Sequence, residues 1–400
     1  MHAPIALGVL YAVNDGAAAA GINNGNTFSL SKVMHAFVDS YNASGGIGGR
    51  HIQPVYAELH SYNSNYEAQI AAACAAFTQD HHVAAVLSNT QYFSEQLLAC
   101  LAKAGVPLIS GDFAGPDRQD AQRYPLFITP TTLVGEDREA AVVGHLAGSG
   151  WLQPRNRIGV VVENCPVDQR IYRSGLLPAL RRAHLTLAST FSTQCFQSIQ
   201  DFGTQTSQMS SAVLQFRQAR VDRVMFVSQG AEANLVLAFS EVANQQQWHP
   251  GYALSSLAVP EALALNAPAA QLANARGLGW LPALDTQDLR QAPATSTGRA
   301  CLARLQRQGI RPTSGTDLAT VSQSCDAFAL FDAILHSTGG DAAGSAVLRA
   351  VARIGDRFVA ATTVGGHERL WGGHLGPASG RLFAWVANKG FRYTSRTFPL

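Results

Sequence analysis

The sequence has few lysines and no strong excess of charge of either sign. Its lysines are Lys32, Lys103 and Lys389, and the formal net charge at pH 7 is +2. No run of basic residues is interleaved with aromatic side chains. The positive field that holds a polyphosphate is therefore missing, and we expect no nucleic-acid partner.

Long apolar runs are missing too. No stretch of 18 consecutive apolar residues occurs, so no segment is expected to span a membrane. Met1, His2 and Ala3 are followed at once by a predicted strand, and they do not resemble a signal peptide. If the natural protein is exported, we expect its signal to have been removed.

Short catalytic and cofactor-binding motifs are absent as well. The sequence has no Gly-x-x-x-x-Gly-Lys-Ser/Thr loop, no Gly-x-Ser-x-Gly elbow, no helical His-x-x-x-His pair and no Cys-x-x-Cys spacing. The glycines of segment 44–50 lie after a predicted helix and before a predicted strand, whereas phosphate binding needs the reverse order. We interpret this segment as a structural turn, and we predict no enzymatic activity, catalytic residue, cofactor or metal.

What the sequence does contain is a regular alternation of strands and helices. Apolar residues recur with helical spacing from Leu30 to Tyr41, and the apolar run Ile5 to Leu10 before them is typical of a buried strand. Similar pairs follow as far as residue 109, and the pattern repeats from 158 to 257. This alternation predicts an α/β fold with parallel, doubly wound sheets, and 400 residues suit two domains.

The order of these segments resembles a known family. An early strand, a Gly/Asn-rich loop, a helix ending in Asn-Ala-Ser-Gly-Gly-Ile-Gly-Gly-Arg50, a strand and then Gly105-Val-Pro-Leu-Ile-Ser110 are similar to the type I periplasmic binding proteins. The similarity is to their branched-chain amino-acid (Leu/Ile/Val) class, the substrate-binding proteins of ABC transporters, and it covers nearly the whole chain. It implies two lobes joined by a three-segment hinge, the Venus-flytrap arrangement, with a ligand trapped in the cleft between them.

On this fold the chain crosses between the lobes three times. We expect lobe 1 to comprise residues 1–129 and 283–380, and lobe 2 to comprise residues 133–279 and 383–400. The hinge is expected near 130–132, 280–282 and 381–382. Three crossings restrict the relative motion of the lobes to bending about one axis, which suits hinge closure.

The six cysteines fall in successive pairs along the chain. Sequence alone allows 15 connectivities. Right-handed crossovers in the expected fold put the helices that carry Cys74 and Cys100 side by side. Cys165 and Cys195 are expected just beyond the ends of two neighbouring strands, and Cys301 and Cys325 on two consecutive helices. We therefore predict the disulfides Cys74–Cys100, Cys165–Cys195 and Cys301–Cys325. Disulfides form in oxidising compartments, and we therefore expect an extracytoplasmic location, either in the periplasm or as a cell-surface lipoprotein. The alternative is six buried, reduced thiols in a cytosolic protein.

Candidate ligand-binding residues follow the carboxyl ends of the predicted strands, where open α/β sheets form a crevice. In lobe 1 they are Asn23, Asn89, Thr90, Gln91, Tyr92, Asp112 and Phe113, and in lobe 2 they are Gln229 and Ser256. The hydroxyls and backbone N–H groups of segment 88–94 lead into a helix and suit a carboxylate. Asp112 suits an ammonium group, and Phe113 an apolar wall. The alternatives are a helix-entry loop around Asn23, a plain N-cap at Ser94, a solvated Asp112 and a core Phe113.

The resemblance also shows where the usual ligand clamp is incomplete. An ungapped match from Gly105 puts Ala114 at a position where the family has a hydroxyl, and Gln91 stands where the family has Ser. An amino acid is the default ligand of the family. The two departures leave aromatic acids, amides and other small carboxylates open as ligands.

We therefore predict an extracytoplasmic solute-binding protein of an ABC importer. It captures a small polar organic molecule by hinge closure, acts as a monomer and delivers the solute to a membrane permease. The alternative function is the ligand-sensing ectodomain of a receptor with the same fold.

Overall fold

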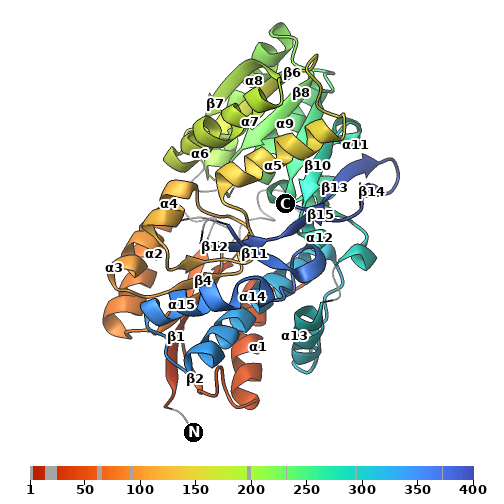
Figure 1. Ribbon diagram of the computed structural model, residues 1–400. Coiled ribbons are helices and arrows are strands. Elements are labelled where there is room, and N and C mark those ends of the chain that lie inside the picture. Colours follow the sequence, from red (N-terminus) through yellow and green to blue (C-terminus); the bar gives the residue numbers. More distant parts are fainter. Residues whose placement is uncertain are drawn as a thin grey trace.

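The computed structural model describes residues 3–13, 25–60, 65–90, 94–195, 200–230, 232–292, 295–371 and 373–400. Strands and helices alternate and form two sheets, each flanked by helices and stacked one above the other (Figure 1). We call the five-stranded sheet with the helices packed on it the first lobe, and the larger sheet with its helices the second lobe. The predicted α/β fold with two lobes is confirmed.

The first lobe is built on a parallel sheet of order β2-β1-β3-β4-β5. Its strands are β1 (Ile5–Val13), β2 (Ile52–His60), β3 (Ala85–Asn89), β4 (Leu108–Ser110) and β5 (Phe127–Ile128). The connecting helices are α1 (Leu30–Ala43), α2 (Tyr66–Ala75) with the π-helical turn η1 (Ala76–Asp80), α3 (Glu95–Lys103) and α4 (Arg118–Arg123). Apart from the edge strand β2, the strands are buried along nearly their whole length because helices cover the sheet on each side.

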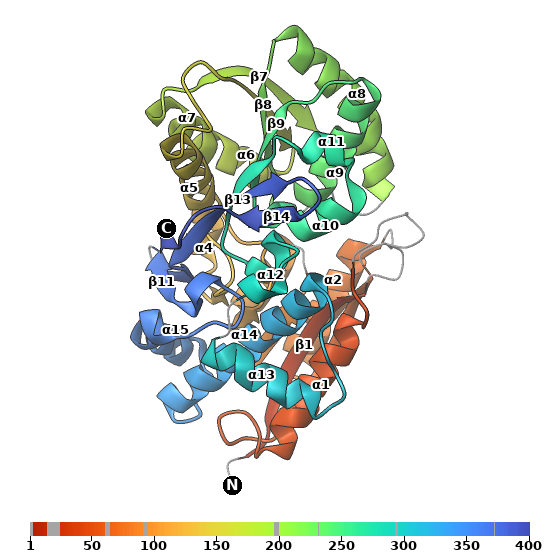
Figure 2. The ribbon, with the colours of Figure 1, turned by 90° about the vertical axis from the view of Figure 1, so that its right-hand side faces the viewer.

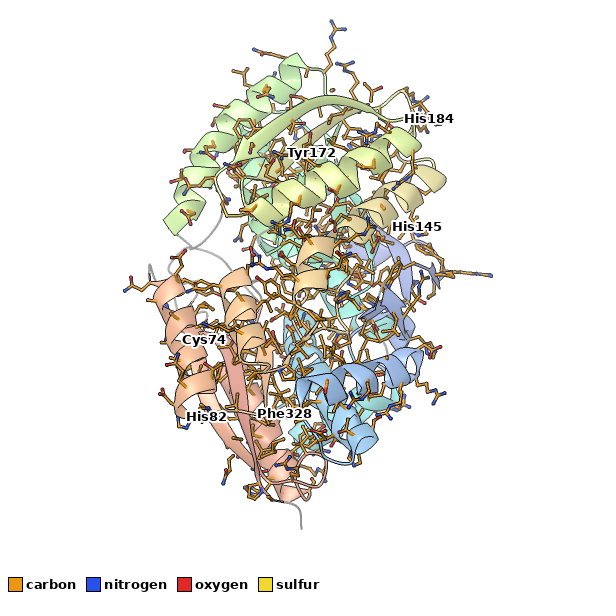
Figure 3. All side chains as sticks on the ribbon, turned by 60° about the vertical axis from the view of Figure 1, so that its left-hand side comes forward. Cys74, His82, His145, Tyr172, His184 and Phe328 are labelled. Carbon is orange, nitrogen blue, oxygen red and sulfur yellow. A yellow bond between two sulfur atoms is a disulfide. The ribbon has the colours of Figure 1, made fainter. Side chains whose placement is uncertain are left out.

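Helices from late in the chain complete the first lobe. They are α13 (Ser296–Gln306), α14 (Gly315–Thr338) and α15 (Gly344–Ile354), and α14 packs on α1, β3 and β4 (Figure 2). Phe328 of α14 stacks against Phe37 and Tyr41 at ring-centroid distances of 5.2 and 5.7 Å, inside the lobe (Figure 3). By length and apolar composition α14 would suit a membrane span, but 78% of its most apolar window is buried within the protein. It is therefore a core helix.

The second lobe is built on a sheet of order β14-β13-β10-β9-β8-β6-β7. Its strands are β6 (Arg157–Glu163), β7 (Thr186–Thr193), β8 (Arg223–Val227), β9 (Gly251–Ser255), β10 (Arg276–Gly279), β13 (Ser379–Val386) and β14 (Gly390–Tyr393), and β15 (Phe398–Pro399) pairs with β13. Strands β6, β7, β8, β9 and β10 run parallel to one another, as predicted. Strands β13 and β14 at the edge of this sheet are antiparallel to their neighbours. They form a hairpin, and a hairpin needs only a short connection between antiparallel strands.

Helices cover both faces of this second sheet. They are α5 (Gly135–Gly148), α6 (Pro166–Ile171), the π-helical turn η2 (Tyr172–Leu176), α7 (Leu177–Arg182), α8 (Gln200–Gln218), α9 (Glu232–Gln245), η3 (Ser256–Ala258), α10 (Pro260–Asn266) and α11 (Ala269–Leu272). Between the lobes lie α12 (Pro282–Asp285) and the hairpin β11 (Glu368–Trp371) and β12 (His374–Pro377), and the remaining short 3-10 turns are η4 (Leu289–Gln291), η5 (Gly355–Arg357) and η6 (Val364–Gly366).

The three segments expected to form the hinge lie side by side. The indole Nε1 of Trp280 donates a hydrogen bond of 3.0 Å to the carbonyl oxygen of Thr131. Strand β10, which ends at Gly279, pairs with β13 at Arg381 and Leu382. The exact boundaries of the lobes stay a prediction.

Three disulfides connect neighbouring elements, in the predicted pairing. Cys74–Cys100 joins α2 to α3, Cys165–Cys195 joins the loops that follow β6 and β7, and Cys301–Cys325 joins α13 to α14. Helix α2, which carries the labelled Cys74, lies at the edge of the first lobe (Figure 3).

The glycine segment between α1 and β2 is a structural turn, as expected. Gly46, Gly48 and Gly49 all have positive φ, which favours glycine. A Cβ atom on Gly46 would lie 2.0 Å from the carbonyl oxygen of Arg50. The backbone N–H of Gly48 donates to Asp332 of α14 at 2.7 Å, so the turn anchors the first lobe.

Candidate functional site

A pocket opens at the carboxyl edge of the first sheet, where β2, β3 and β4 end. Its polar lining consists of Ser88, Thr90, Ser94, Ser110 and Asp112. Its apolar lining consists of Leu59, Ile70, Leu97, Leu98, Leu108, Ala114 and Phe127, with Tyr66 beside them. Ser94 is the N-cap of α3, and its hydroxyl accepts a hydrogen bond from the backbone N–H of Leu97. The lining of the pocket therefore combines hydroxyls and one carboxylate with apolar side chains.

Asp112 contacts three of the hydroxyls in this lining. Its side chain is buried, with 4% of the residue exposed. The hydroxyls of Ser110 and Thr90 donate to its carboxylate at 2.8 and 3.1 Å, and the hydroxyl of Ser88 lies at 3.4 Å. The backbone N–H of Thr90 donates to the other carboxylate oxygen. These hydrogen bonds fix the loop after β3 against the loop after β4.

The other residues predicted for lobe 1 have different surroundings. Asn89 is fully buried, and its amide donates to the Ser324 hydroxyl of α14 at 3.1 Å, while its Oδ1 has no hydrogen-bond partner among the described residues. Phe113 is buried in the apolar cluster that includes Trp280 and Leu281, so it packs at the junction of the lobes. Asn23, Gln91 and Tyr92 lie outside the described residues.

Gln229, predicted for lobe 2, binds a buried arginine. The Nη1 of Arg138 donates to Gln229 Oε1 at 2.6 Å, and the same guanidinium pairs with Glu139 at 2.9 Å. Arg138 and Glu139 come from the start of α5 and are both buried. The Nε2 of Gln229 has no hydrogen-bond partner among the described residues. Arg138 and Glu139 were not predicted, because no motif marks them in the sequence.

The second residue predicted for lobe 2 is Ser256, and its hydroxyl already binds backbone N–H groups. Its hydroxyl oxygen accepts hydrogen bonds from the N–H groups of Trp280 and Leu281 at 2.9 and 3.3 Å. Ser256 thus ties the end of β9 to the segment that leaves β10. This geometry gives it a structural contact with the expected hinge.

Buried carboxyl groups gather at the carboxyl edge of the second sheet. Glu163 at the end of β6 accepts from Gln205 at 2.6 Å and from Ser228 at 3.0 Å. Burial raises the pKa of Asp168 well above its usual range, and the charge of Glu163 raises it further. Burial raises the pKa of Glu232 to about 8, although the charge of Arg138 opposes this shift. A single guanidinium therefore faces several carboxyl groups.

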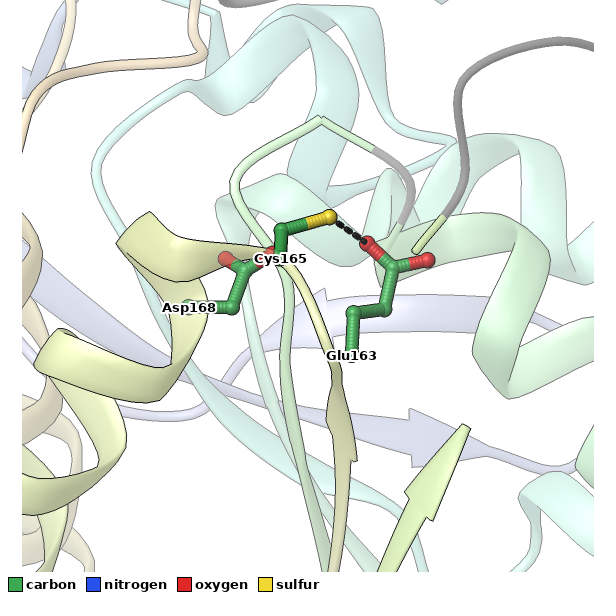
Figure 4. A group of neighbouring side chains, drawn as sticks. All are labelled: Glu163, Cys165 and Asp168. Atoms are coloured by element: carbon green, nitrogen blue, oxygen red, sulfur yellow. Dashed lines mark hydrogen bonds between the residues drawn. The ribbon is translucent and has the colours of Figure 1, made fainter. Parts of the chain in front are cut away.

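One subset of this cluster has the spacing of a metal site. The ligand-type atoms of Glu163, Cys165 and Asp168 lie within 4.8 Å of one another (Figure 4). The Sγ of Cys165 is bonded to Cys195, so it is not a thiolate and has no proton to donate. The 3.9 Å between this Sγ and Glu163 Oε2 is therefore a van der Waals contact. The three residues do not make a metal site.

Polar contacts connect the two lobes across this edge. Arg170 of α6 pairs with Asp117 and, at 2.7 Å, with Asp120, both of which lie between β4 and β5 in the first lobe. Burial and the neighbouring Asp117 raise the pKa of Asp120 to about 6. On α14, the hydroxyl of Thr316 donates to Glu261 of α10 at 2.7 Å. The carboxyl edges of the two sheets thus face each other in a closed arrangement.

Comparison with known proteins finds solved structures with a similar fold. No protein-family model matches the sequence, and no curated protein sequence matches it. A solute-binding protein of an ABC transporter from Rhodopseudomonas palustris HaA2, in complex with p-hydroxybenzoic acid, is 14% identical with a TM-score of 0.70, and the match covers 100% of this chain and 97% of that chain.

Two further solved structures match over nearly their whole length. A possible leucine/isoleucine/valine-binding protein from Rhodopirellula baltica SH 1 is 14% identical, with a TM-score of 0.70 and coverage of 98% of this chain and 96% of that chain. An ABC transporter substrate-binding protein from Desulfitobacterium hafniense, in complex with Leu, is 12% identical, with a TM-score of 0.64 and coverage of 98% and 100%. The chain therefore has the fold of the type I periplasmic binding proteins, as predicted.

Proposed function

We propose that the protein is a solute-binding protein of an ABC importer, which captures a small organic molecule between its lobes and delivers it to a membrane permease. The observation that carries this proposal is the amphipathic pocket at the carboxyl edge of the first sheet, on a fold whose matched structures are solute-binding proteins over nearly their whole length. The bound molecules of two of those structures, p-hydroxybenzoic acid and Leu, combine a polar group with an apolar body. The pocket has the same two kinds of surface, but its free volume is about 20 Å³, so it has to widen as the lobes open before a solute enters.

The disulfides support an extracytoplasmic location. Three bridges use all six cysteines, and disulfides persist in oxidising compartments. We include in the proposal that the protein acts as a monomer without enzymatic activity. Binding then needs no chemistry on the solute, only a closed state that the solute stabilises through contacts with both lobes.

The hinge is proposed at the three adjacent segments 130–132, 280–282 and 381–382. Trp280 and Thr131 hold two of them together by a hydrogen bond, and β10 pairs with β13 beside them. Each lobe has an apolar core of its own. Two bodies joined by three adjacent chain segments suit rotation about that connection.

Thermal unfolding with a panel of amino acids, aromatic acids, amides, polyamines and sugars tests the function. The protein is first unfolded in urea and refolded, so that any retained solute is removed. A solute present at 100 times its Kd adds about 2.7 kcal/mol to the free energy of unfolding, so we expect one chemical class to raise Tm by several degrees. The absence of any such rise across the whole panel would contradict the proposal.

A matched pair of variants separates binding from stability. Ser94→Ala removes the N-cap of α3 at the pocket, and Ser29→Ala removes the N-cap of α1 away from it. Each change is expected to cost about 1 kcal/mol of stability. Only Ser94→Ala should weaken binding of the solute found in the panel. Equal effects of both variants on affinity would place the solute elsewhere.

A further inference from the structure

The starts of three neighbouring strands in the second lobe carry a concentration of positive charge. Strand β6 pairs with β7 on one side and with β8 on the other, so the segments that contain their first residues, 149–158, 180–187 and 215–224, meet at the amino edge of the sheet. Together these segments contain seven arginines and one aspartate, a net charge of +6, whereas the whole chain carries +2. The small total charge therefore conceals a basic face that no single run of residues shows.

Six of these arginines are exposed at the surface, and we call them the basic edge. They are Arg155, Arg157, Arg181, Arg182, Arg217 and Arg220. The Nε of Arg157 donates to the carbonyl oxygen of Ala219 at 2.8 Å, which places Arg157 beside Arg220. Within the described part of the chain, no acidic side chain forms an ion pair with any of the six. Their charge therefore faces solvent.

The acidic side chains on the flanking elements offset little of this charge. The carboxylate of Asp222 accepts hydrogen bonds from the amide of Asn156 and from the backbone N–H of Arg157, both at 2.9 Å. Glu241 is exposed four residues before the end of α9, the helix that packs on α8. These two carboxylates leave most of the charge of the basic edge uncompensated.

Helix termini account for only part of the basic edge. Arg181 and Arg182 are in the last turn of α7, and Arg217 is in the last turn of α8, where a cation stabilises the helix. Each helix C-terminus carries the equivalent of about half a negative charge, so two of them balance about one arginine. Helix stability therefore does not explain six arginines at this edge, and an external anion is the remaining explanation.

An apolar side chain beside the basic edge favours a lipid surface as that anion. Leu214 is 54% exposed, more than any other large apolar side chain of the described residues, and it lies three residues before Arg217 on α8. Arginine beside exposed aliphatic surface suits the boundary between lipid headgroups and acyl chains. Single-stranded nucleic acid instead needs aromatic rings on which bases stack, and the ring of Trp151 is covered by the guanidinium of Arg223 at 4.7 Å.

The position of the basic edge leaves the junction of the lobes uncovered. Strand β6 begins at Arg157 on the amino edge and ends at Glu163, among the carboxyl groups near the first lobe. His184, which follows α7, lies on the second lobe away from the first lobe (Figure 3). A flat surface that contacts the basic edge is therefore at the opposite end of the second sheet from the junction.

We propose that the basic edge binds the surface of a membrane that contains anionic phospholipids. Such a surface attracts several arginines at once, and the attraction acts within a Debye length. Binding keeps the protein at the membrane in which its permease lies. The inference goes beyond the proposed function: it rests on the proposed extracytoplasmic location and is independent of which solute the protein captures.

The test is co-sedimentation of the protein with vesicles of two compositions. One contains equal parts of phosphatidylglycerol and phosphatidylcholine, and the other contains phosphatidylcholine alone. At about 0.1 M NaCl, where the Debye length is about 10 Å, we expect at least 10-fold tighter binding to the anionic vesicles. At about 1 M NaCl the Debye length is about 3 Å, and this binding should be lost. Equal binding to both compositions, or no binding to either, would overturn the inference.

Two matched variants test whether the basic edge is the surface that binds. The first replaces four arginines whose side chains make no hydrogen bond or ion pair among the described residues: Arg155→Gln, Arg181→Gln, Arg182→Gln and Arg220→Gln. The second removes the same charge from exposed positions on and after α13 and α15 of the first lobe: Arg307→Gln, Arg311→Gln, Arg349→Gln and Arg357→Gln. We expect at least 10-fold weaker binding to anionic vesicles in the first variant and less than 2-fold in the second. Equal weakening would mean that total charge decides, and the assignment of the basic edge would be wrong.

A DNA duplex separates a bilayer from a soluble polyanion. At equal phosphate concentration we expect the anionic vesicles to bind the protein at least 10-fold more tightly than the duplex does. Leu214→Gln should weaken binding to the vesicles and leave binding to the duplex unchanged. Tighter binding to the duplex would contradict the inference of a membrane partner. The solute-binding function is measured without vesicles or DNA, so it stands or fails separately.

Discussion

At the scale of single residues, the second lobe combines burial with ionisable groups. Glu232 is buried at the start of α9, and its carboxylate accepts hydrogen bonds from Ser255. Burial raises its pKa to about 8, and the nearby Glu139 raises it while Arg138 lowers it. Asp285 and Asp326, each also buried, have pKa values of about 7 for the same reason. In the folded protein these groups retain protons that the unfolded chain has released.

This retention predicts how stability depends on pH. A folded pKa above the unfolded pKa means that the contribution of Glu232 is fully present below about pH 4.5 and is lost as pH rises to about 8. We expect the free energy of unfolding to fall between pH 5.5 and pH 8.5, with Glu232 contributing on the order of 3 kcal/mol. Glu232→Gln, which keeps the shape without the charge, should reduce this fall. Urea unfolding at both pH values measures it.

The control for this prediction is an exposed glutamate on the same helix. Glu241→Gln removes one carboxylate from the surface of α9 and should leave the pH dependence as it is in the unchanged protein. If Glu232→Gln is no more stable than the unchanged protein at pH 8.5, Glu232 is ionised in the folded state at lower pH than expected.

The candidate site shows what a sequence reveals at this scale. Asp112 and Thr90 were predicted because residues at the carboxyl ends of parallel strands converge, and the structure brings these two together. Ser256 was predicted on the same ground, but its hydroxyl binds the backbone of Trp280 and Leu281. A strand pattern gives the end of the sheet at which a side chain lies. It does not tell whether that side chain is already hydrogen-bonded to the backbone of another segment and is therefore not available to a ligand.

At the scale of elements, each disulfide joins two segments that lie close together in the sequence. Each bridge joins two cysteines that are successive in the sequence and 24 to 30 residues apart, and the expected order of helices and strands brings each pair together, so the pairing could be predicted. The antiparallel edge at β13 and β14 was not predicted, because the apolar pattern of a strand does not give the direction in which the strand runs in its sheet. The π-helical turns η1 and η2 leave no signal in apolar spacing.

The bridge between α2 and α3 allows a measurement of what such a connection contributes. Its cysteines are 26 residues apart. Replacing both in Cys74→Ser/Cys100→Ser releases a loop of that length in the unfolded chain, which is expected to cost about 3 to 4 kcal/mol of stability in the chain-entropy model. Urea unfolding of the double variant and of the unchanged protein gives the difference directly.

Thiol titration provides the control for this prediction. Under denaturing, non-reducing conditions the unchanged protein should show no free thiols, and the double variant should show none either. Six free thiols in the unchanged protein would contradict both the bridges and the extracytoplasmic location. A double variant that is as stable as the unchanged protein would mean that the unfolded chain remains compact around this loop.

At the scale of the whole molecule, the ion pairs of Arg170 decide between two accounts of the contact between the lobes. The guanidinium is 28% exposed, and its partners Asp117 and Asp120 are buried. If the contact forms only on closure, its loss destabilises the closed state alone, because opening returns both carboxylates to water. Removing one partner of a well-buried pair costs about 3–5 kcal/mol, and partial exposure reduces this to about 1–3 kcal/mol.

We therefore expect Arg170→Gln to weaken solute binding by roughly 5- to 150-fold, the factor that about 1–3 kcal/mol gives. Small-angle X-ray scattering should show a ligand-bound radius of gyration that stays close to the ligand-free value in this variant, whereas the unchanged protein becomes more compact. Arg173→Gln is the matched control, because Arg173 is exposed on the adjacent π-helical turn. Suppose instead that Arg170→Gln lowers the stability of the ligand-free protein and leaves affinity unchanged. The pair would then persist in both states, and the closing motion would have to occur about an axis that passes near α4 and α6.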